Sequence, residues 1–114
     1  MQKTITPTGT CPPYGRQCIA VAADIISSKW TPQLIYALSC GVQRFCGLQK
    51  EVGGVNPRTL SARLDELERS GIIEKVSYPE VPPRVEYSLT DKGQELVPIL
   101  QTMLTWGDKY CDEP

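Results

Sequence analysis

The sequence predicts a mainly helical α+β domain, a winged helix–turn–helix with dimerisation helices at its N- and C-terminal ends. Three observations lead to this fold class. Two consecutive helical patterns, at 47–52 and 57–70, are separated by a short glycine-containing turn. A pattern with a period of two follows at 72–89 and predicts a two-stranded hairpin. Further apolar helical patterns lie before and after this unit.

The length of 114 residues fits one domain with a single modest core. Residues 1–17 contain three prolines and two glycines, so we expect a flexible N-terminal arm. The winged helix–turn–helix domain is then predicted over 18–110, and 111–114 form a C-terminal tail. No apolar run approaches the roughly 18 residues of a membrane span. The N-terminus lacks the apolar stretch of a secretory signal, so we expect a cytoplasmic protein without a membrane partner.

The first two helices are predicted from apolar spacing and from capping residues. Apolar residues at i, i+3 and i+4 steps indicate a helix over 18–26. Thr31 is of a type favoured as an N-cap, and Pro32 is favoured at the first helical position. The second helix should therefore start at Thr31, run to about Ser39 and end before Gly41.

A very short strand is expected at 43–45, ahead of the helix at 47–52. Asn56 followed by Pro57 is a strong helix start, with Asn as N-cap and Pro at the first position. This helix should run to residue 70 and end at Gly71. Its apolar stripe consists of Leu60, Leu64 and Leu67.

The hairpin at 72–89 has an unusual tip, because 79–84 contains three prolines, which lack the N–H that a strand ladder needs. The tip should therefore be exposed and stiff. Thr90 is then predicted as the cap of one long final helix, in which Pro98 should produce a kink.

Charge and composition exclude several kinds of chemistry. The net charge of −1 divides into +1 for 1–28, +1 for 29–92 and −3 for 93–114, so charge alone gives no support for nucleic-acid binding. The chain has no histidine, which removes histidine-based triads and zinc sites that need imidazole. We expect no metal, no cofactor and no enzymatic activity.

Five cysteines occur at positions 11, 18, 40, 46 and 111, and none forms a CxxC pair. In a reducing compartment structural disulfides are not expected. We predict that Cys18, Cys40 and Cys46 pack as small apolar side chains. Cys46 leaves an alternative open, because a helix N-terminus lowers a thiol pKa and makes the thiol reactive.

Several runs of residues together resemble one known family. They are Ser28-Lys29-Trp30-Thr31, Arg44-Phe45, Leu60-Ser61-Ala62-Arg63-Leu64-Asp65-Glu66-Leu67-Glu68, Gly71-Ile72-Ile73, the long wing run 78–93 and Trp106-Gly107. In these runs the chain resembles the HxlR-type winged helix–turn–helix regulators of bacteria and archaea, which are related to the MarR type. The resemblance covers most of the chain.

The resemblance implies a transcriptional regulator that acts as a homodimer on a pseudo-palindromic operator in double-stranded DNA. Each subunit then places its recognition helix, at 57–70, in one of two successive major grooves. Repression is the mode that we expect. The chain departs from the family at Ala62, where the family often carries a longer polar side chain.

Turning the recognition helix by about 100° per residue separates its buried leucines from the side chains that could meet DNA. The candidates for base edges are Arg58, Thr59, Ser61 and Ala62. We expect Arg84 on the wing to enter a minor groove. The predicted phosphate contacts are Lys29, Arg44, Lys50, Arg63 and, on the wing, Lys75. Two alternatives stay open, a merely solvated helix face and an Arg84 that pairs with Glu80 or Glu86.

The final helix is apolar on a face too broad for one small core, because this face includes Leu96 and Ile99 as well as the dimerisation residues predicted on this helix. A partner chain is the simplest cover for this face, and the first helix is expected to contribute. The predicted dimerisation residues are Ile19, Ile26, Leu100, Met103, Leu104, Trp106 and Tyr110. The alternative is a lid within one chain.

Family members that sense oxidants, quinones or other electrophiles carry an N-terminal Cys-Pro, and some carry a cysteine just after the final helix. Cys11-Pro12 and Cys111 match these positions. The resemblance thus implies a thiol switch, induced by a small electrophile or oxidant. The alternative to the switch is two ordinary surface thiols. The alternatives to a DNA-binding regulator are a winged-helix protein-interaction module without DNA and a small thiol enzyme, and the absence of histidine argues against the enzyme.

Overall fold

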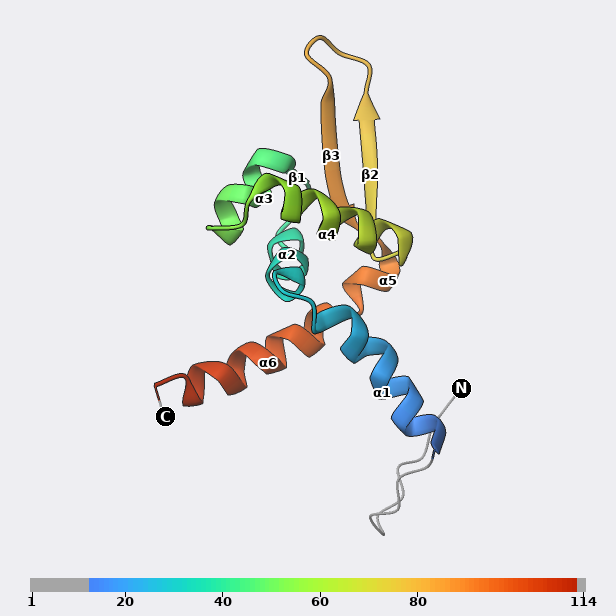
Figure 1. The fold of residues 1–114 in the computed structure, drawn as a ribbon, viewed down its shortest axis with the longest axis vertical. Helices are drawn as coiled ribbons and strands as arrows, with labels where there is room; N and C mark the ends of the chain where they lie inside the picture. The colour runs from blue at the N-terminus through green and yellow to red at the C-terminus, as the bar shows by residue number, and fades with distance from the viewer. Residues whose placement is uncertain (1–12, 113–114) are drawn as a thin grey trace.

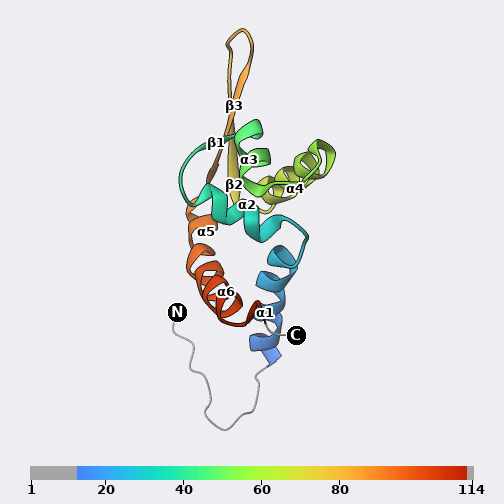
Figure 2. The same cartoon turned by 90° about the vertical axis from the view of Figure 1, so that its left-hand side faces the viewer.

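The computed structural model describes residues 13–112 and has the predicted mainly helical winged helix–turn–helix fold. Its elements are α1 (Pro13–Ile26), α2 (Thr31–Leu38), β1 (Gln43–Arg44), α3 (Phe45–Val52), α4 (Pro57–Arg69), β2 (Ile73–Tyr78), β3 (Arg84–Leu89), α5 (Asp91–Gln94) and α6 (Val97–Tyr110). Helices α2, α3 and α4 form the body, from which the β2–β3 hairpin rises (Figure 1). Helices α1 and α6 project from the opposite end, as Figure 2 also shows. No helix among the described residues is long and apolar enough to cross a membrane.

The three strands form one antiparallel sheet in the order β1-β3-β2. The hairpin register runs from the pair Ile73 and Leu89 at its root to the pair Tyr78 and Arg84 next to the tip. The short strand β1 pairs with the root half of β3, where Gln43 lies opposite Tyr87. The sheet is therefore held at its base, while its tip extends beyond the helices.

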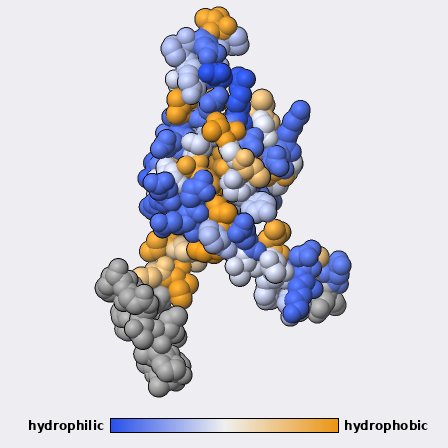
Figure 3. All heavy atoms as spheres, turned by 180° about the vertical axis from the view of Figure 1, so that it is seen from behind, coloured by the Kyte–Doolittle hydropathy of each residue, from blue (hydrophilic) through white to orange (hydrophobic). Residues whose placement is uncertain are grey.

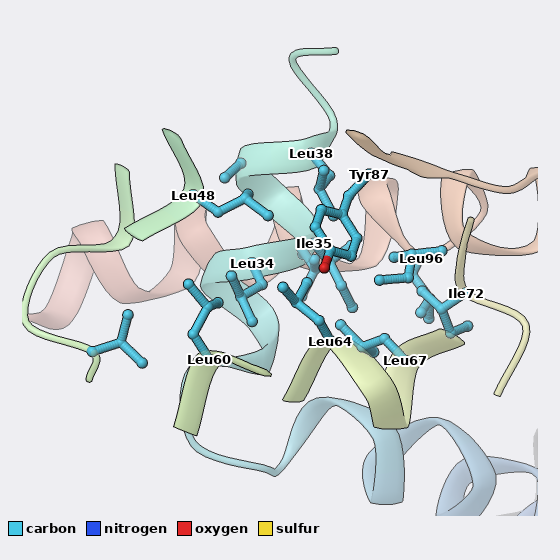
Figure 4. Packing of buried hydrophobic residues seen from close by; sticks show 14 residues of the cluster. Leu34, Ile35, Leu38, Leu48, Leu60, Leu64, Leu67, Ile72, Tyr87 and Leu96 are labelled. Carbon is cyan, nitrogen blue, oxygen red and sulfur yellow. The ribbon is translucent and has the colours of Figure 1, made fainter. Parts of the chain in front are cut away.

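The hydrophobic core lies between α2, α4 and the root of the sheet, and α3 and α6 close it at two sides (Figure 4). The predicted stripe of α4 is confirmed, because Leu60, Leu64 and Leu67 are all buried. The fully buried large side chains are Leu34, Ile35, Leu38, Leu48, Leu60, Leu64, Ile72 and Ile73.

The predicted start of α4 is confirmed at the atomic level. The Asn56 side chain accepts a hydrogen bond of 2.8 Å from the Thr59 amide, which caps the helix. Pro57 stands in the first turn, where its missing N–H leaves no bond unmade. Gly71 has φ 77°, the left-handed conformation that ends the helix and that glycine adopts without strain.

The predicted start of the first helix and the predicted N-cap of the second are wrong. Helix α1 begins at Pro13 rather than at Cys18, so the helix includes the last part of the predicted arm; residues 1–12 lie outside the described residues. A proline is compatible with a first helical turn, whose N–H groups have no helical acceptors. Helix α2 has Thr31 inside it, buried, and its N-cap is Trp30 with φ 78°. A tertiary contact, not the local residue type, decides this cap, because the Trp30 ring packs against the core.

The single kinked final helix that we expected is instead two helices, α5 and α6. Thr90 does cap the first of them, since its hydroxyl oxygen accepts from the Gly93 amide at 3.1 Å. The Leu96 amide then donates a hydrogen bond to the carbonyl of Gly93, three residues earlier, which is a tighter turn than that of an α-helix. The Leu96 side chain is buried. Pro98 falls in the first turn of α6, where it fits, and not in a helix interior where it would produce a kink.

Burial in this core raises the pKa of Tyr87 above its ordinary value of 10.0, and the carboxylates Asp65 and Glu68 add to the effect. The unfolded chain therefore loses the Tyr87 proton first, so this group destabilises the folded state as the pH rises above 10.0. We expect the variant Tyr87→Phe to lose less stability than the wild type between about pH 9 and about pH 11. Urea unfolding followed at both pH values measures this difference, and equal losses would contradict the assignment.

Candidate nucleic-acid interface

The first half of α4 presents an open polar face. Arg58, Ser61 and Ala62 are exposed and Thr59 is half-buried, while the leucine stripe of the same helix is buried. Because Asn56 caps the helix start, the backbone that carries these four side chains is fixed. The acidic side chains Asp65, Glu66 and Glu68 lie in the second half, so α4 is basic to neutral near its start and acidic near its end.

The Arg63 side chain is used inside the molecule. Its Nε donates a hydrogen bond of 3.0 Å to the carbonyl of Lys29, in the turn between α1 and α2. One of its terminal nitrogens lies 3.4 Å from the Glu66 carboxylate, and the side chain is 26% exposed. The predicted contact of Arg63 with a phosphate remains a prediction. Within the chain, the same guanidinium contacts the Lys29 carbonyl and the Glu66 carboxylate.

Arg84 is the first residue of β3 and stands below the wing tip, not on it. Of the two acidic partners that the sequence left open, it pairs with both, at 3.1 Å to Glu80 and 3.6 Å to Glu86. Its guanidinium also lies 4.2 Å from the centre of the Tyr78 ring. Val81 at the tip is completely exposed. The tip is therefore a proline-rich loop that exposes an apolar side chain. The charge of Arg84 beneath it is paired with two carboxylates.

The other predicted cations are free of acidic partners at salt-bridge distance within the described part of the chain. Lys29, Arg44, Lys50 and Lys75 are all exposed. They come from the α1–α2 turn, β1, α3 and β2, respectively. Lys29 lies over the Trp30 ring, with its Nζ 5.3 Å from the ring centre.

Two of the predicted dimerisation residues belong to the core of their own chain. Leu100 is buried, with 5% exposure, and Ile26 is half-buried against the core. Each has this position because the end of its helix nearer the body packs on α2. Five others, Ile19, Met103, Leu104, Trp106 and Tyr110, are exposed.

Ile99 belongs to the broad apolar face predicted for the final helix, and it is 42% exposed. With Met103, Trp106 and Tyr110 it forms a row along α6 at steps of four, three and four residues. This is the spacing of a coiled-coil seam, so the sequence carried a signal that could have found it. We call this row the α6 seam. Seen from behind in Figure 3, the spheres over α6 are mostly hydrophilic or of intermediate hydropathy.

A shallow apolar groove of about 250 Å³ lies between α2 and α6, beside the α6 seam. Its walls are formed by Pro32, Gln33, Tyr36, Leu100, Met103 and Leu104. Leu104, 55% exposed, thus faces the groove and not the seam.

The prediction that Cys18, Cys40 and Cys46 pack as small apolar side chains is wrong for the described chain, in which all three are exposed. Each lies on the solvent-facing side of its helix or just beyond the helix end. Apolar neighbours in sequence do not determine whether such a residue is buried or exposed. Cys111 is exposed at the end of α6, with its Sγ 3.7 Å from the Asp108 carbonyl oxygen. Cys11 lies outside the described residues. Within those residues no group of three or more Cys, Asp or Glu side chains could hold a metal ion.

Comparison with known proteins agrees with this architecture. Residues 25–114 match the model of the HxlR-like helix-turn-helix family. The HTH-type transcriptional regulator YdeP of Bacillus subtilis is 43% identical over 94 residues, which cover 82% of this chain and 73% of YdeP.

Two solved structures of redox and transcriptional regulators have the same fold. The redox regulator HypR in its reduced form is 37% identical with a TM-score of 0.79, covering 83% of this chain and 94% of HypR. The reduced form of the transcriptional regulator YodB from B. subtilis is 28% identical with a TM-score of 0.71, covering 92% and 99%. The chain belongs to the HxlR-like helix-turn-helix family and is a transcriptional regulator of the HxlR/MarR type.

Proposed function

We propose that this regulator binds double-stranded DNA as a homodimer in the cytoplasm and represses transcription from a pseudo-palindromic operator. The observation that carries the proposal is the capped start of α4, where Arg58, Ser61 and Ala62 are exposed above a buried leucine stripe. A helix held in this way can enter a major groove with its N-terminal side chains toward the base edges.

In this proposal Arg58 contacts a guanine edge or a phosphate, Thr59 and Ser61 contact either bases or backbone, and the Ala62 methyl meets a thymine methyl. The exposed cations Lys29, Arg44, Lys50 and Lys75 neutralise phosphates and make binding salt-dependent.

The partner subunit covers the α6 seam and the exposed apolar residues of α1, Ile19 and Val21. Trp106 is 67% exposed and its ring centre lies 5.0 Å from that of Tyr110, so the pair offers a large aromatic surface that water covers poorly. Both helices project from the end opposite the wing, which leaves α4 free to meet DNA (Figure 1).

We infer that thiol chemistry switches the dimer. HypR, with which this chain shares its fold, is a redox regulator. Attack by an electrophile on Cys11, or a bridge between Cys11 and Cys111 of the two subunits, would change the spacing of the recognition helices. Because operator half-sites have a fixed spacing, such a change lowers affinity. Oxidants or small electrophiles are then the inducers.

DNA binding is tested by selecting sequences from a randomised DNA library with this protein. The affinity for the selected sequence is then measured by fluorescence anisotropy. Removing Arg58 from both subunits should lower affinity at least about 30-fold, since each good base contact contributes about 1 kcal/mol or more. Arg69→Ala is the matched control, since it removes the same charge from the exposed last residue of α4. Equal effects of Arg58→Ala and Arg69→Ala would contradict the base contact, and a library without enrichment would contradict DNA binding.

On the wing, we expect Arg84→Ala to lower operator affinity without unfolding the protein, because the change leaves Glu80 and Glu86 facing DNA uncompensated. The variant Glu80→Gln, which removes the acidic residue paired with Arg84, should have the opposite effect and raise operator affinity. Anisotropy at fixed salt measures both, and the melting temperature reports the fold. Unchanged affinity in both variants means that the wing does not approach DNA.

Diamide treatment tests the thiol switch. We expect wild type to form a dimer band in non-reducing electrophoresis and to lose operator affinity, and Cys11→Ser to do neither. The switch is excluded if wild type shows no dimer band and binds the operator equally well before and after treatment.

A further inference from the structure

Over residues 18–26, helix α1 packs on the body near its C-terminal end. Ile25 and Ile26 pack partly against the core, whereas Ile19 and Val21, farther from the body, are 70% and 64% exposed. Figure 1 shows the helix extending away from the body. The direction of α1 therefore depends on the turn that follows it, residues 27–30.

The body holds this turn through Trp30. Its backbone has the left-handed φ of 78°, which is uncommon for a bulky residue and persists only where surrounding contacts require it. Its ring packs partly buried on the core and lies 3.7 Å from the position that a Cβ would take on Gly54, in the turn before α4. Its carbonyl accepts the Leu34 amide and so begins α2.

Arg63 connects the same turn to α4. The Nε edge of its guanidinium donates to the Lys29 carbonyl at 3.0 Å, and a terminal nitrogen pairs with Glu66 one turn further along α4. The two bonds use different edges of one planar group, so they fix both the position and the orientation of the guanidinium. A lysine in its place would keep the charge but not this fork.

We propose that Arg63 is a positioning residue that fixes the angle between α1 and α4, and thereby sets the half-site spacing that the dimer accepts. The inference rests on the proposed function, in which α1 and α6 meet the partner and α4 meets DNA. In such a dimer two α1–α4 junctions lie on one of the connections between the recognition helices, beside the connection through α6. A looser junction lets each α4 adjust to a displaced half-site.

Spacing is a sensitive readout because one added base pair moves a half-site by about 3.4 Å and turns it by about 34°. The DNA selected by wild type gives the reference site. Variants of this site with one base pair added or removed between the half-sites are then titrated with wild type, Arg63→Lys, Arg63→Gln and the control Arg69→Gln.

We expect wild type and Arg69→Gln to bind the altered spacings at least about tenfold more weakly than the reference. For Arg63→Lys and Arg63→Gln the loss should shrink to about threefold or less, with melting temperatures near wild type. A residue with only a general structural role would lower affinity for all these sites alike.

The rival role of Arg63, a phosphate contact, predicts different results. Arg63→Lys would then discriminate spacings like wild type. Arg63→Gln would lower the slope of log affinity against log salt by about 1.8 for the dimer, at about 0.9 per phosphate. Either outcome overturns the positioning role and leaves the proposed function intact. If wild type selects no sequence or stays monomeric, the proposed function fails and this inference fails with it.

Discussion

Replacing Gly93 with alanine is expected to destabilise the protein by at least about 3 kcal/mol and to lower Tm by more than about 10 °C. A Cβ at this buried position would lie 2.2 Å from the Ile72 carbonyl oxygen and 3.0 Å from a Leu89 methyl. The carbonyl cannot move aside easily, because it also accepts the Thr90 amide at 3.0 Å. Urea and thermal unfolding of the variant measure the loss.

Gly47→Ala is the matched control for this prediction. It also adds one methyl to a helix, but the only nearby atom is the movable end of the Gln43 side chain, at 3.0 Å. Because alanine favours helix over glycine, stability should change by no more than about 1 kcal/mol in either direction. The contact between Gly93 and Ile72 would be unimportant if the two variants unfolded alike.

The second large effect is expected at the α6 seam. Trp106→Glu should weaken the homodimer at least about 30-fold, since an exposed tryptophan that becomes buried between subunits contributes about 2 kcal/mol or more. The fold of each subunit should persist, because the Trp106 side chain is 67% exposed in the single chain. Sedimentation equilibrium measures the association, and circular dichroism checks the helices.

Gln101→Glu controls for the added charge. Residue 101 is exposed on the polar side of α6, away from the seam. We expect this variant to dimerise like wild type and to bind DNA with the same affinity, while Trp106→Glu loses both. A wild type that sediments as a monomer at micromolar concentration would falsify the dimer altogether.

Local rules were sufficient for the part of the fold that carries the proposed recognition surface. Asn56, Pro57 and Gly71 specify the two ends of α4 through bonds within a few residues, and the leucine spacing specifies its buried side. The exposed face is what remains. For this reason the placement of Arg58, Ser61 and Ala62 could be predicted from the sequence alone.

Contacts between distant segments decided the features that the sequence could not give. The break between α5 and α6 accompanies the approach of Gly93 in α5 to Ile72, which lies just before β2, and no helical periodicity records this contact. The guanidinium of Arg63 meets Lys29, a residue 34 positions earlier. For Arg84 the sequence offered Glu80 and Glu86 as alternatives, and only the hairpin register brings both within reach.

The bare tip of the wing has a practical consequence. Val81 is completely exposed, and the ion pairs that order the hairpin end belong to Arg84 below it. A fluorophore attached to the Val81→Cys variant, in a chain whose five native cysteines are replaced, should leave the fold unchanged. Its emission would then report directly on whatever the wing touches, with unlabelled DNA as the titrant.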